Sequence, residues 1–301
     1  MLYPTYEVNG VPMQDPAGRW HEHEETLVLP SHPGIVGAEL ILPGVSGVIP
    51  MPVSQLDKGL MTLTLRIEAR NIRGIMGGTR AAKQEHLYRN AQELLRYMGI
   101  ARQTSGEPAR ITKRISASLS VETYGRMIAS TEIDHAPGGG YAIYQIVFEL
   151  HSPIWQGQRV TTDVPNGLST ITELASSNAP IEGATVMLSG PFTSIWVTND
   201  LSNGFSLAPT GGMKQGEAVL VDTNRWTVSS RLSIADAKAR IYDPNPPGAS
   251  SGALSSIGLQ TGSALTLLPG PQGVRVNVGG NGRSYTEGGT SVWLNVREAF
   301  L

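Results

Sequence analysis

The sequence predicts a mainly β fold in two domains, residues 1–153 and 154–301, with one α-helix in the first domain. Glycine and proline contribute 35 and 20 of the 301 residues, while charged residues make up only 16%, against about 25% in an average protein. The first half contains segments in which apolar and polar residues alternate, as they do in strands with one buried face. The second half contains short apolar segments separated by turn signals. The length suits two domains of about 150 residues each.

Three segments of the first half alternate with the period of two that is typical of a half-buried strand. In the first segment, Thr62, Thr64, Arg66, Glu68 and Arg70 predict a side that faces solvent. The second segment carries Lys113 as the one polar residue on its apolar side. Three glycines, 138–140, predict a hairpin between 127–133 and the third segment. The expected strands are Leu60–Arg70, Ile111–Glu122 and Tyr141–Leu150.

A helix of about 19 residues is expected between the first and second of these strands. Its apolar residues recur at the spacing of one helix face. Thr79 can cap its first turn and Gly99 can end it in a left-handed conformation. The residues of the apolar face are Leu87, Ala91, Leu94, Leu95 and Met98.

The domain boundary is placed after Ser152-Pro153, because the residues that follow, Gln156–Asn166, are polar and prone to form turns. Beyond it, closely spaced short strands are typical of a sandwich or jelly roll. The segment Pro244–Gly262 is rich in Pro, Gly and Ser and is expected to be a long exposed loop. The expected strands are Thr185–Leu188, Ser194–Val197, Phe205–Leu207, Ala218–Val221, Arg225–Val228, Leu265–Leu268, Val274–Val278 and Val292–Val296.

Composition excludes several classes of protein. With 23 Lys and Arg against 25 Asp and Glu, the net charge of −2 gives no overall field that would attract nucleic acid or an acidic membrane. The absence of cysteine excludes disulfides, thiolate metal sites and a cysteine nucleophile. Neither a secretion signal nor a membrane-spanning apolar run is found, so a soluble protein is expected.

No catalytic motif is found: the sequence lacks a G-x-S-x-G elbow, a phosphate-binding loop, an H-E-x-x-H pair and an EF-hand loop. We therefore expect no enzyme and no cofactor. The strongest metal candidate is His21, His23 and Glu25, which would point to one side of an extended strand. A solvated edge strand explains this cluster better, so no metal site is predicted.

Two groups of residues are candidates for binding other molecules. Trp196 and Trp226, with Phe205, could form a platform on which a sugar stacks, although such residues also build cores. The most basic stretch could face nucleic acid or an acidic neighbouring subunit, and a subunit interface or a plain solvated face is the preferred interpretation. Its residues are Arg66, Arg70, Arg73 and Arg80, and Arg89 and Arg96 lie on the polar side of the expected helix.

The order of these elements resembles a known family, the distal tail proteins (Dit) of phages with long non-contractile tails. The resemblance rests on the strand Gly59–Ile67, the pair Arg73-Gly74, the helix ending at Leu94-Leu95, and two β segments that follow. Downstream, Gly216–Thr223 (GEAVLVDT) resembles a turn of the family's galectin-like carboxy-terminal domain. Leu267–Gly270 and the closing Val292–Leu301 resemble its final strands.

This resemblance implies an amino-terminal β-sandwich, or belt domain, that forms a hexameric ring, and a galectin-like β-sandwich that projects outward. It implies a structural protein of the virion, made in the host cytoplasm and located at the distal end of the tail. Its partners would be further copies of itself, the tail tube protein, the tail tip or hub protein and receptor-binding proteins. DNA would pass through the ring without being read, and no membrane contact is implied.

Three alternatives remain open at this point. The protein could be a carbohydrate-binding, lectin-like adhesion protein that uses Trp196 and Trp226. It could be a metal-dependent hydrolase built on His21, His23 and Glu25. It could also be another minor tail or baseplate component with the same two-domain plan.

Overall fold

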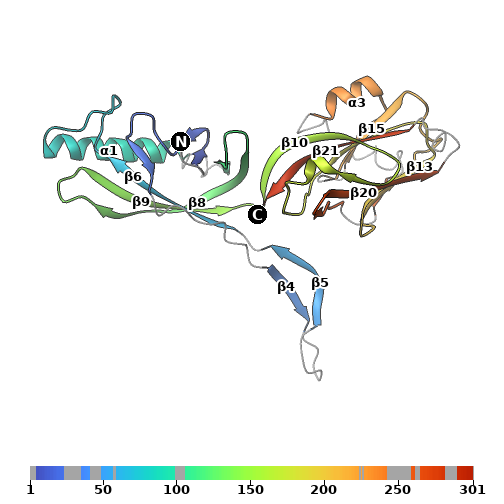
Figure 1. Ribbon diagram of the computed structural model, residues 1–301, viewed down its shortest axis with the longest axis horizontal. Helices are drawn as coiled ribbons and strands as arrows, with labels where there is room; N and C mark the ends of the chain where they lie inside the picture. The colour runs from blue at the N-terminus through green and yellow to red at the C-terminus, as the bar shows by residue number, and fades with distance from the viewer. Residues whose placement is uncertain are drawn as a thin grey trace. The chain divides into compact units, whose positions relative to one another are not determined.

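The computed structural model describes residues 5–23, 59–98, 106–223, 225, 227–242, 265–281 and 290–300, and the backbone course of 35–40, 49–56 and 259–261. The chain divides into two compact units, residues 1–156 with Leu301, and residues 157–300 (Figure 1). Strands dominate both units, which confirms the predicted mainly β fold class. Among the described residues, no helix has the length and apolar character needed to cross a membrane.

The first unit is built on an antiparallel sheet with the strand order β3-β6-β9-β8. The beginning of β8 also pairs with β7, which pairs with β1, and β1 pairs with β2. A separate antiparallel pair is formed by β4 and β5. The bounds are β1 Thr5–Val8, β2 Val11–Pro12, β3 Trp20–Glu22, β4 Ile35–Leu40, β5 Ile49–Leu56, β6 Leu60–Glu68, β7 Ala109–Arg114, β8 Ser120–His135 and β9 Tyr141–Leu150.

The predicted alternation explains the core of this sheet. Leu63 and Leu65 of β6 and Phe148 of β9 are fully buried and belong to one hydrophobic cluster. The predicted hairpin is confirmed, because β8 and β9 pair and the glycines 138–140 lie in the loop between them. The expectation of a fully solvent-facing side on β6 is wrong for Thr64 and Glu68, which are buried.

The buried carboxylate of Glu68 has a partner on its own strand. Arg66 Nε lies 2.8 Å from Glu68 Oε1, and the Arg66 guanidinium lies 4.0 Å from the centre of the Tyr141 ring. Arginine commonly forms both an ion pair and an aromatic contact in this way. The polar side of β6 is therefore partly covered by its own side chains.

Helix α1, Arg80–Tyr97, confirms the predicted helix. The hydroxyl of Thr79 accepts a hydrogen bond from the backbone amide of Ala82, which satisfies one of the free amides of the first turn. Leu94 and Met98 are buried in the same cluster as the sheet residues, so α1 covers one face of the sheet (Figure 1). Gly99, the predicted stop signal, lies outside the described residues.

The strand expected over Ile111–Glu122 is two strands. β7 ends at Arg114 and β8 begins at Ser120, and the backbone amides of Ile115 and Ser116 both donate to Leu119 O in the turn between them. The alternation was misleading because apolar residues on both sides of the turn, Ile111 of β7 and Val121 of β8, are buried and stay in phase in the sequence. Lys113 lies near the rings of Tyr6 and Trp155, at 6.0 and 5.9 Å, and burial lowers the pKa of its ammonium group.

The second unit contains two antiparallel sheets, which fits the expected sandwich. One has the order β16-β15-β12-β21-β10, with β17 also beside β15, and the other has the order β11-β20-β13-β14-β18, with β19 beside β20. The bounds are β10 Trp155–Val164, β11 Gly167–Ile171, β12 Thr185–Ser189, β13 Ser194–Asn199, β14 Gly204–Leu207, β15 Glu217–Asp222, β16 Thr227–Val228, β17 Leu232–Ser233, β18 Leu259–Thr261, β19 Pro269–Gly270, β20 Gly273–Asn281 and β21 Ser291–Phe300.

Three expectations for this half are corrected. The polar stretch 156–166 contains most of β10, because backbone pairing does not require an apolar side chain at alternate positions. The segment 265–268 forms no strand, and Leu267 makes an isolated bridge with Ile181. Residues 259–261 of the expected loop form β18, while 243–258 lie outside the described residues.

A short helix, α3 Ile234–Arg240, was not predicted. The Ser233 hydroxyl accepts from the Asp236 amide at its start. It packs Ala237 and Ile241 against Met187 and Leu220, and so covers the outer side of β12 and β15. A helix of this length shows too few turns for its periodicity to be recognised in the sequence.

Candidate functional site

Two surfaces of the first unit expose apolar side chains that a folded domain normally buries or covers. The first is residues 126–135 of β8, here called the outer β8 segment. The second is the connection between β6 and α1, residues 71–78, here called the Ile72 loop.

The outer β8 segment is paired along one edge only. Beyond Gly125 its partner is β9, and the pairing with β7 ends at Gly125 opposite Ala109. Among the described residues, no strand pairs with its second edge. Every residue from 128 to 135 is exposed, so neither face is covered. Edge strands of this kind offer a row of free amides and carbonyls to another chain.

Two β-bulges interrupt the outer segment. The register with β9 shifts between Met127 and Ala129 and again between Glu132 and Asp134. The extra residues are Ile128 and Ile133, which are 49% and 51% exposed. Bulges bend a strand and redirect a side chain. Here both bulges fall on an isoleucine, so the segment displays two large apolar side chains.

The end of the outer segment around Ile133 is acidic, whereas its beginning carries the exposed Arg126. Glu132 and Asp134 are both exposed. The Tyr144 hydroxyl donates to Glu132 Oε2 at 3.1 Å, and His135 Nδ1 lies 3.4 Å from Glu132 Oε1. The hydroxyl of Tyr144 therefore fixes the Glu132 carboxylate from β9 and leaves it at the surface.

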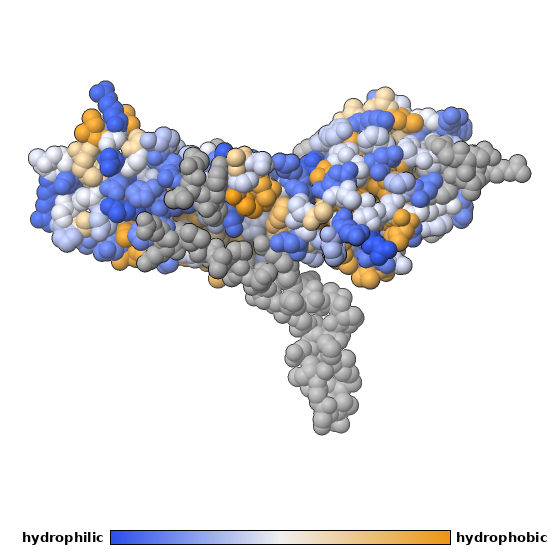
Figure 2. Space-filling view, in the orientation of Figure 1, coloured by the Kyte–Doolittle hydropathy of each residue, from blue (hydrophilic) through white to orange (hydrophobic). Residues whose placement is uncertain are grey.

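The Ile72 loop exposes three apolar side chains: Ile72 is 77% exposed, Ile75 is 59% exposed, and Met76 is also exposed. In the view of Figure 1 it rises above α1, and Figure 2 shows apolar atoms there, below a hydrophilic tip. Its fold is fixed by local hydrogen bonds. Asn71 Oδ1 accepts from the amides of Arg73 and Ile75, and Arg70 Nη1 donates to Gly74 O at 2.9 Å.

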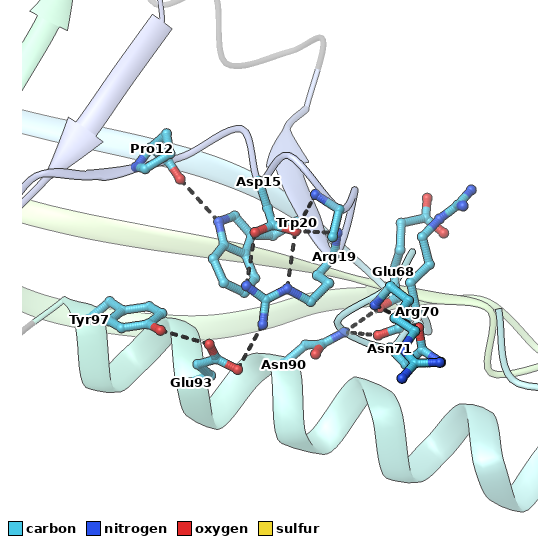
Figure 3. A network of polar contacts seen from close by, with 12 residues as sticks. Pro12, Asp15, Arg19, Trp20, Glu68, Arg70, Asn71, Asn90, Glu93 and Tyr97 are labelled. Atoms are coloured by element: carbon cyan, nitrogen blue, oxygen red, sulfur yellow. Dashed lines mark hydrogen bonds and ion pairs between the residues drawn. The ribbon is translucent and has the colours of Figure 1, made fainter. Parts of the chain in front are cut away.

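A buried asparagine ties this loop to the helix. Nδ2 of Asn90, on α1, donates to Glu68 O at 2.9 Å and to Arg70 O at 2.8 Å (Figure 3). Gly74 has a φ of +78°, and a Cβ at this position would lie 3.0 Å from Ala17 O. The loop is therefore held against the segment that precedes β3, and glycine is needed at position 74.

An ion-pair network fixes that segment to α1 (Figure 3). The Arg19 guanidinium donates to Asp15 Oδ1 and to Glu93 Oε2, each at 2.9 Å. Burial alone would raise the pKa of the Asp15 carboxyl, but hydrogen bonds from Arg19 and from the Ala17 amide outweigh it and lower that pKa. The pKa of Glu93 is also lowered, because hydrogen bonds from Tyr97 and Arg19 outweigh its burial.

The two surfaces lie at opposite edges of the sheet. In the order β3-β6-β9-β8, the outer β8 segment is one edge. The Ile72 loop lies at the other, because Gly74 approaches Ala17 and the Arg70 side chain approaches Gly18, just before β3. Three strand spacings of about 4.8 Å separate the edges, roughly 14 Å.

The predicted basic residues do not form one patch. Arg66 is engaged with Glu68 and Tyr141, and Arg70 holds the Ile72 loop. Arg73 and Arg80 are exposed, in the loop and at the first position of α1.

The two helix arginines both have partners within the unit. Arg89 is paired with Glu85 at 2.6 Å on the exposed side of α1. The Arg96 guanidinium lies 5.3 Å from the centre of the Tyr97 ring. Their contact with a neighbouring subunit stays a prediction.

The candidate metal ligands have structural surroundings. His21 lies on β3 opposite Arg66, and burial lowers the pKa of its imidazole. The backbone amide of His23 donates to Thr64 O. Glu25 lies outside the described residues. Within the part of the chain that the structure describes, no group of three His, Asp or Glu side chains could hold a metal ion.

Of the candidate sugar-stacking residues, Trp196 is exposed by 36% on β13, whereas Phe205 is buried. Gly279 on β20 is paired with Trp196. A Cβ on Gly279 would lie 2.2 Å from the Trp196 ring, so the indole lies against this glycine. Ser206 is its neighbour on the other side, and Thr198 and Asn277 form the next pair along the strands. Trp226 lies outside the described residues.

Sequence reasoning missed the apolar residues of both surfaces. Ile72 and Ile75 lie in a loop and follow neither the helix period nor the strand period. Nothing in the local sequence therefore distinguishes this loop from an ordinary connection. In β8, Ile128 and Ile133 are five residues apart, an odd spacing that does not follow the period of two of a strand with one buried face.

No protein-family model and no curated protein matches this sequence. Among solved structures, the chain resembles the crystal structure of the SPP1 Dit protein (gp 19.1), described as a paradigm of the hub adsorption apparatus in phages that infect Gram-positive hosts. The TM-score is 0.61 at 17% identity, and 100% of both chains is covered. It also resembles a chain of the phage P2 baseplate in its activated conformation with calcium, with a TM-score of 0.38 at 9% identity over 99% and 98% of the chains. The likeness to SPP1 Dit shows that this chain has the fold of a phage distal tail protein.

Proposed function

We propose that this protein is a structural component of a long non-contractile phage tail and forms a hexameric ring at the distal end of that tail. The ring would join the tail tube to the tail tip or baseplate. The observation that carries the proposal is the likeness to SPP1 Dit over the whole chain. The open edge of the outer β8 segment supports it, because a ring supplies each such edge with a neighbour.

The electrostatics suit a ring of identical copies. A net charge of −2 spread over 301 residues leaves little repulsion between copies. In a cyclic ring every contact joins two different surfaces of the chain. The first unit carries two such surfaces at opposite edges of its sheet, which is the arrangement that a ring requires.

The two domains would have different roles in the tail. Residues 1–153 would form the ring and stack on the tail tube, while residues 154–301, a galectin-like sandwich, would project outward toward the tip, the hub or receptor-binding proteins. DNA would pass through the lumen without sequence-specific contacts. The role is structural, with no catalysis and no cofactor, and the protein would be located in the virion.

The native mass of the full chain, measured by light scattering together with negative-stain imaging, tests this proposal. We expect closed sixfold rings with a central channel, either from the protein alone or after mixing with purified tail tube protein. A protein that stays monomeric in both conditions would contradict the proposal. Immunogold labelling of intact virions provides an independent measurement, with label expected at the distal end of the tail.

A second candidate function is carbohydrate binding by the second unit. The favouring observation is the exposed indole of Trp196, which lies against Gly279 with hydroxyl and amide side chains on the same strands. An aromatic ring with polar neighbours is how many sandwich domains hold a sugar ring. Binding of the full chain to an oligosaccharide array, lost in Trp196→Ala and retained in Leu201→Ala, would support it. An array without signal would exclude it.

A further inference from the structure

We propose that the Ile72 loop of one copy packs on the outer β8 segment of the next copy, so that the two surfaces form one head-to-tail contact. This inference rests on the proposed ring. It goes further by naming the surface that each copy contributes, and by assigning a role to apolar residues that the fold of the single chain leaves exposed.

The apolar parts of the two surfaces match in character. The loop offers Ile72, Ile75 and Met76, and the β8 segment offers Ile128 and Ile133. All five are exposed in the single chain. Burying such side chains against one another is the main source of favourable free energy in protein association. A contact between the two surfaces removes both sets from water at once.

The charges are complementary. Arg73 lies within the loop and Arg80 at the start of the following helix, both exposed. Glu132 and Asp134 flank Ile133 on β8 and are exposed as well. Arg126, also exposed, lies at the other end of the outer β8 segment. The charges around Ile133 are thus negative, and those of the loop and the start of α1 are positive. Such complementarity selects the correct partner and suppresses loop-to-loop or strand-to-strand pairing.

Both surfaces are fixed before they meet. The loop is held by the side chains of Asn71 and Asn90 and by the tight approach of Gly74 to Ala17. The β8 segment is held by its pairing with β9, with bulges that fix where Ile128 and Ile133 lie. Surfaces that are already ordered lose less conformational entropy on binding.

The positions of the two surfaces indicate that a second copy of the chain packs on each of them. They are at opposite edges of one sheet, roughly 14 Å apart by strand spacing, so a copy cannot bring its own loop onto its own β8. A neighbouring copy can do so, and repetition of the same contact closes a ring. A different tail protein that covered either surface would leave the other without a partner.

Cross-linking gives a direct test, since the chain contains no cysteine. A chain with Ile75→Cys and Ile133→Cys, treated with a short bismaleimide alone and after mixing with purified tail tube protein, should give a ladder of covalent multimers in the condition that forms rings. The matched control carries Leu201→Cys with Ile133→Cys, because Leu201 is as exposed as Ile75 but lies in the second unit. The control should stay mainly monomeric. Equal or absent laddering in the two proteins would overturn the proposed contact.

Two single variants test the polarity of the contact. Ile75→Asp disables the loop and Ile133→Asp disables the β8 segment, and both should remain folded by circular dichroism because both side chains are exposed. Each alone should weaken assembly at least tenfold. Mixed in equal amounts, they should form dimers and nothing larger, since only one intact loop and one intact β8 segment remain per pair.

A charge exchange completes the test. Arg73→Glu and Asp134→Arg should each weaken assembly several-fold, and the chain with both changes should recover it. If the unchanged chain forms rings and none of these variants alters them, the contact is wrong while the proposed function stands. If the unchanged chain forms no ring, either alone or with purified tail tube protein, and the cross-linked ladder is also absent in both conditions, both fail.

Discussion

The carboxylate of Glu93, on α1, lies 2.9 Å from the guanidinium of Arg19, in the segment that precedes β3. The same guanidinium is bound to Asp15 at 2.9 Å and lies 4.4 Å from the centre of the Trp20 ring. Arg19 therefore connects the helix, the chain before β3 and the aromatic core of the first unit. All of these groups have little exposure. Removing one charged side chain therefore leaves its partner as a charge that water cannot fully solvate.

We predict that Asp15→Asn lowers the free energy of unfolding by about 1–3 kcal/mol, because Arg19 loses a charged partner. The pKa of Asp15 is lowered in the folded chain, so its stabilising effect is present above the unfolded pKa of about 4 and is lost as the pH falls further. Urea unfolding between pH 7 and pH 3 should therefore show a smaller decrease in the free energy of unfolding for the variant than for the unchanged chain. The matched control is Glu85→Gln, whose exposed pair with Arg89 should contribute less than about 1 kcal/mol. Equal effects of the two changes would contradict this account.

Asn90→Ala should loosen the Ile72 loop. The change removes both hydrogen bonds to Glu68 O and Arg70 O, and leaving such carbonyls unpaired costs about 1–3 kcal/mol. Hydrogen exchange of residues 71–78 should become faster while that of β9 is unchanged. Gln92→Ala, on the exposed side of the same helix, provides the control. Unchanged exchange in the loop would mean that its own turns hold it without the helix.

Local sequence patterns were sufficient to predict the helices and strands that bury one face in a regular repeat. The stripe of Leu87, Ala91 and Leu94 predicted α1, and the alternation from Leu60 predicted β6, because in both cases neighbours along the chain share one core. The hairpin of β8 and β9 followed from its glycines and its alternation. These signals lie within about ten residues and need no knowledge of the rest of the fold.

The candidate site was largely missed because it depends on contacts between distant segments. The Ile72 loop is held by Asn90 on α1 and by Ala17 before β3, and neither contact is visible in a single pattern. The turn at 115–119 was missed because the alternation stayed in phase across it. Strand β10 was missed because its polar side chains are largely exposed and its order comes from backbone pairing.

Gly279→Ala should displace the indole of Trp196. An added Cβ would lie 2.2 Å from two atoms of that ring, so the ring must move. We expect a loss of about 1–3 kcal/mol in the stability of the second unit, which is typical of overpacking. Acrylamide quenching of tryptophan fluorescence should also show greater exposure of Trp196. The signal of Trp196 is obtained as the difference between each protein and the same protein carrying Trp196→Phe. Gly138→Ala, where a Cβ meets no atom within 4 Å, should change neither quantity.

Tyr6 should make the first unit sensitive to alkali. Burial, together with the negative charge of Glu22, raises the pKa of the Tyr6 hydroxyl to about 12. In the unfolded chain this hydroxyl ionises near pH 10. Between these values the unfolded state releases a proton that the folded state retains, so stability falls as the pH rises, by about 1 kcal/mol at pH 11. Tyr6→Phe removes this contribution, and its urea midpoint should fall less steeply between pH 8 and pH 11 than that of the unchanged chain. Tyr88→Phe, an exposed tyrosine on α1, serves as the control. A Tyr6→Phe protein that loses stability with the same slope would show that burial of this hydroxyl is not what limits the fold at high pH.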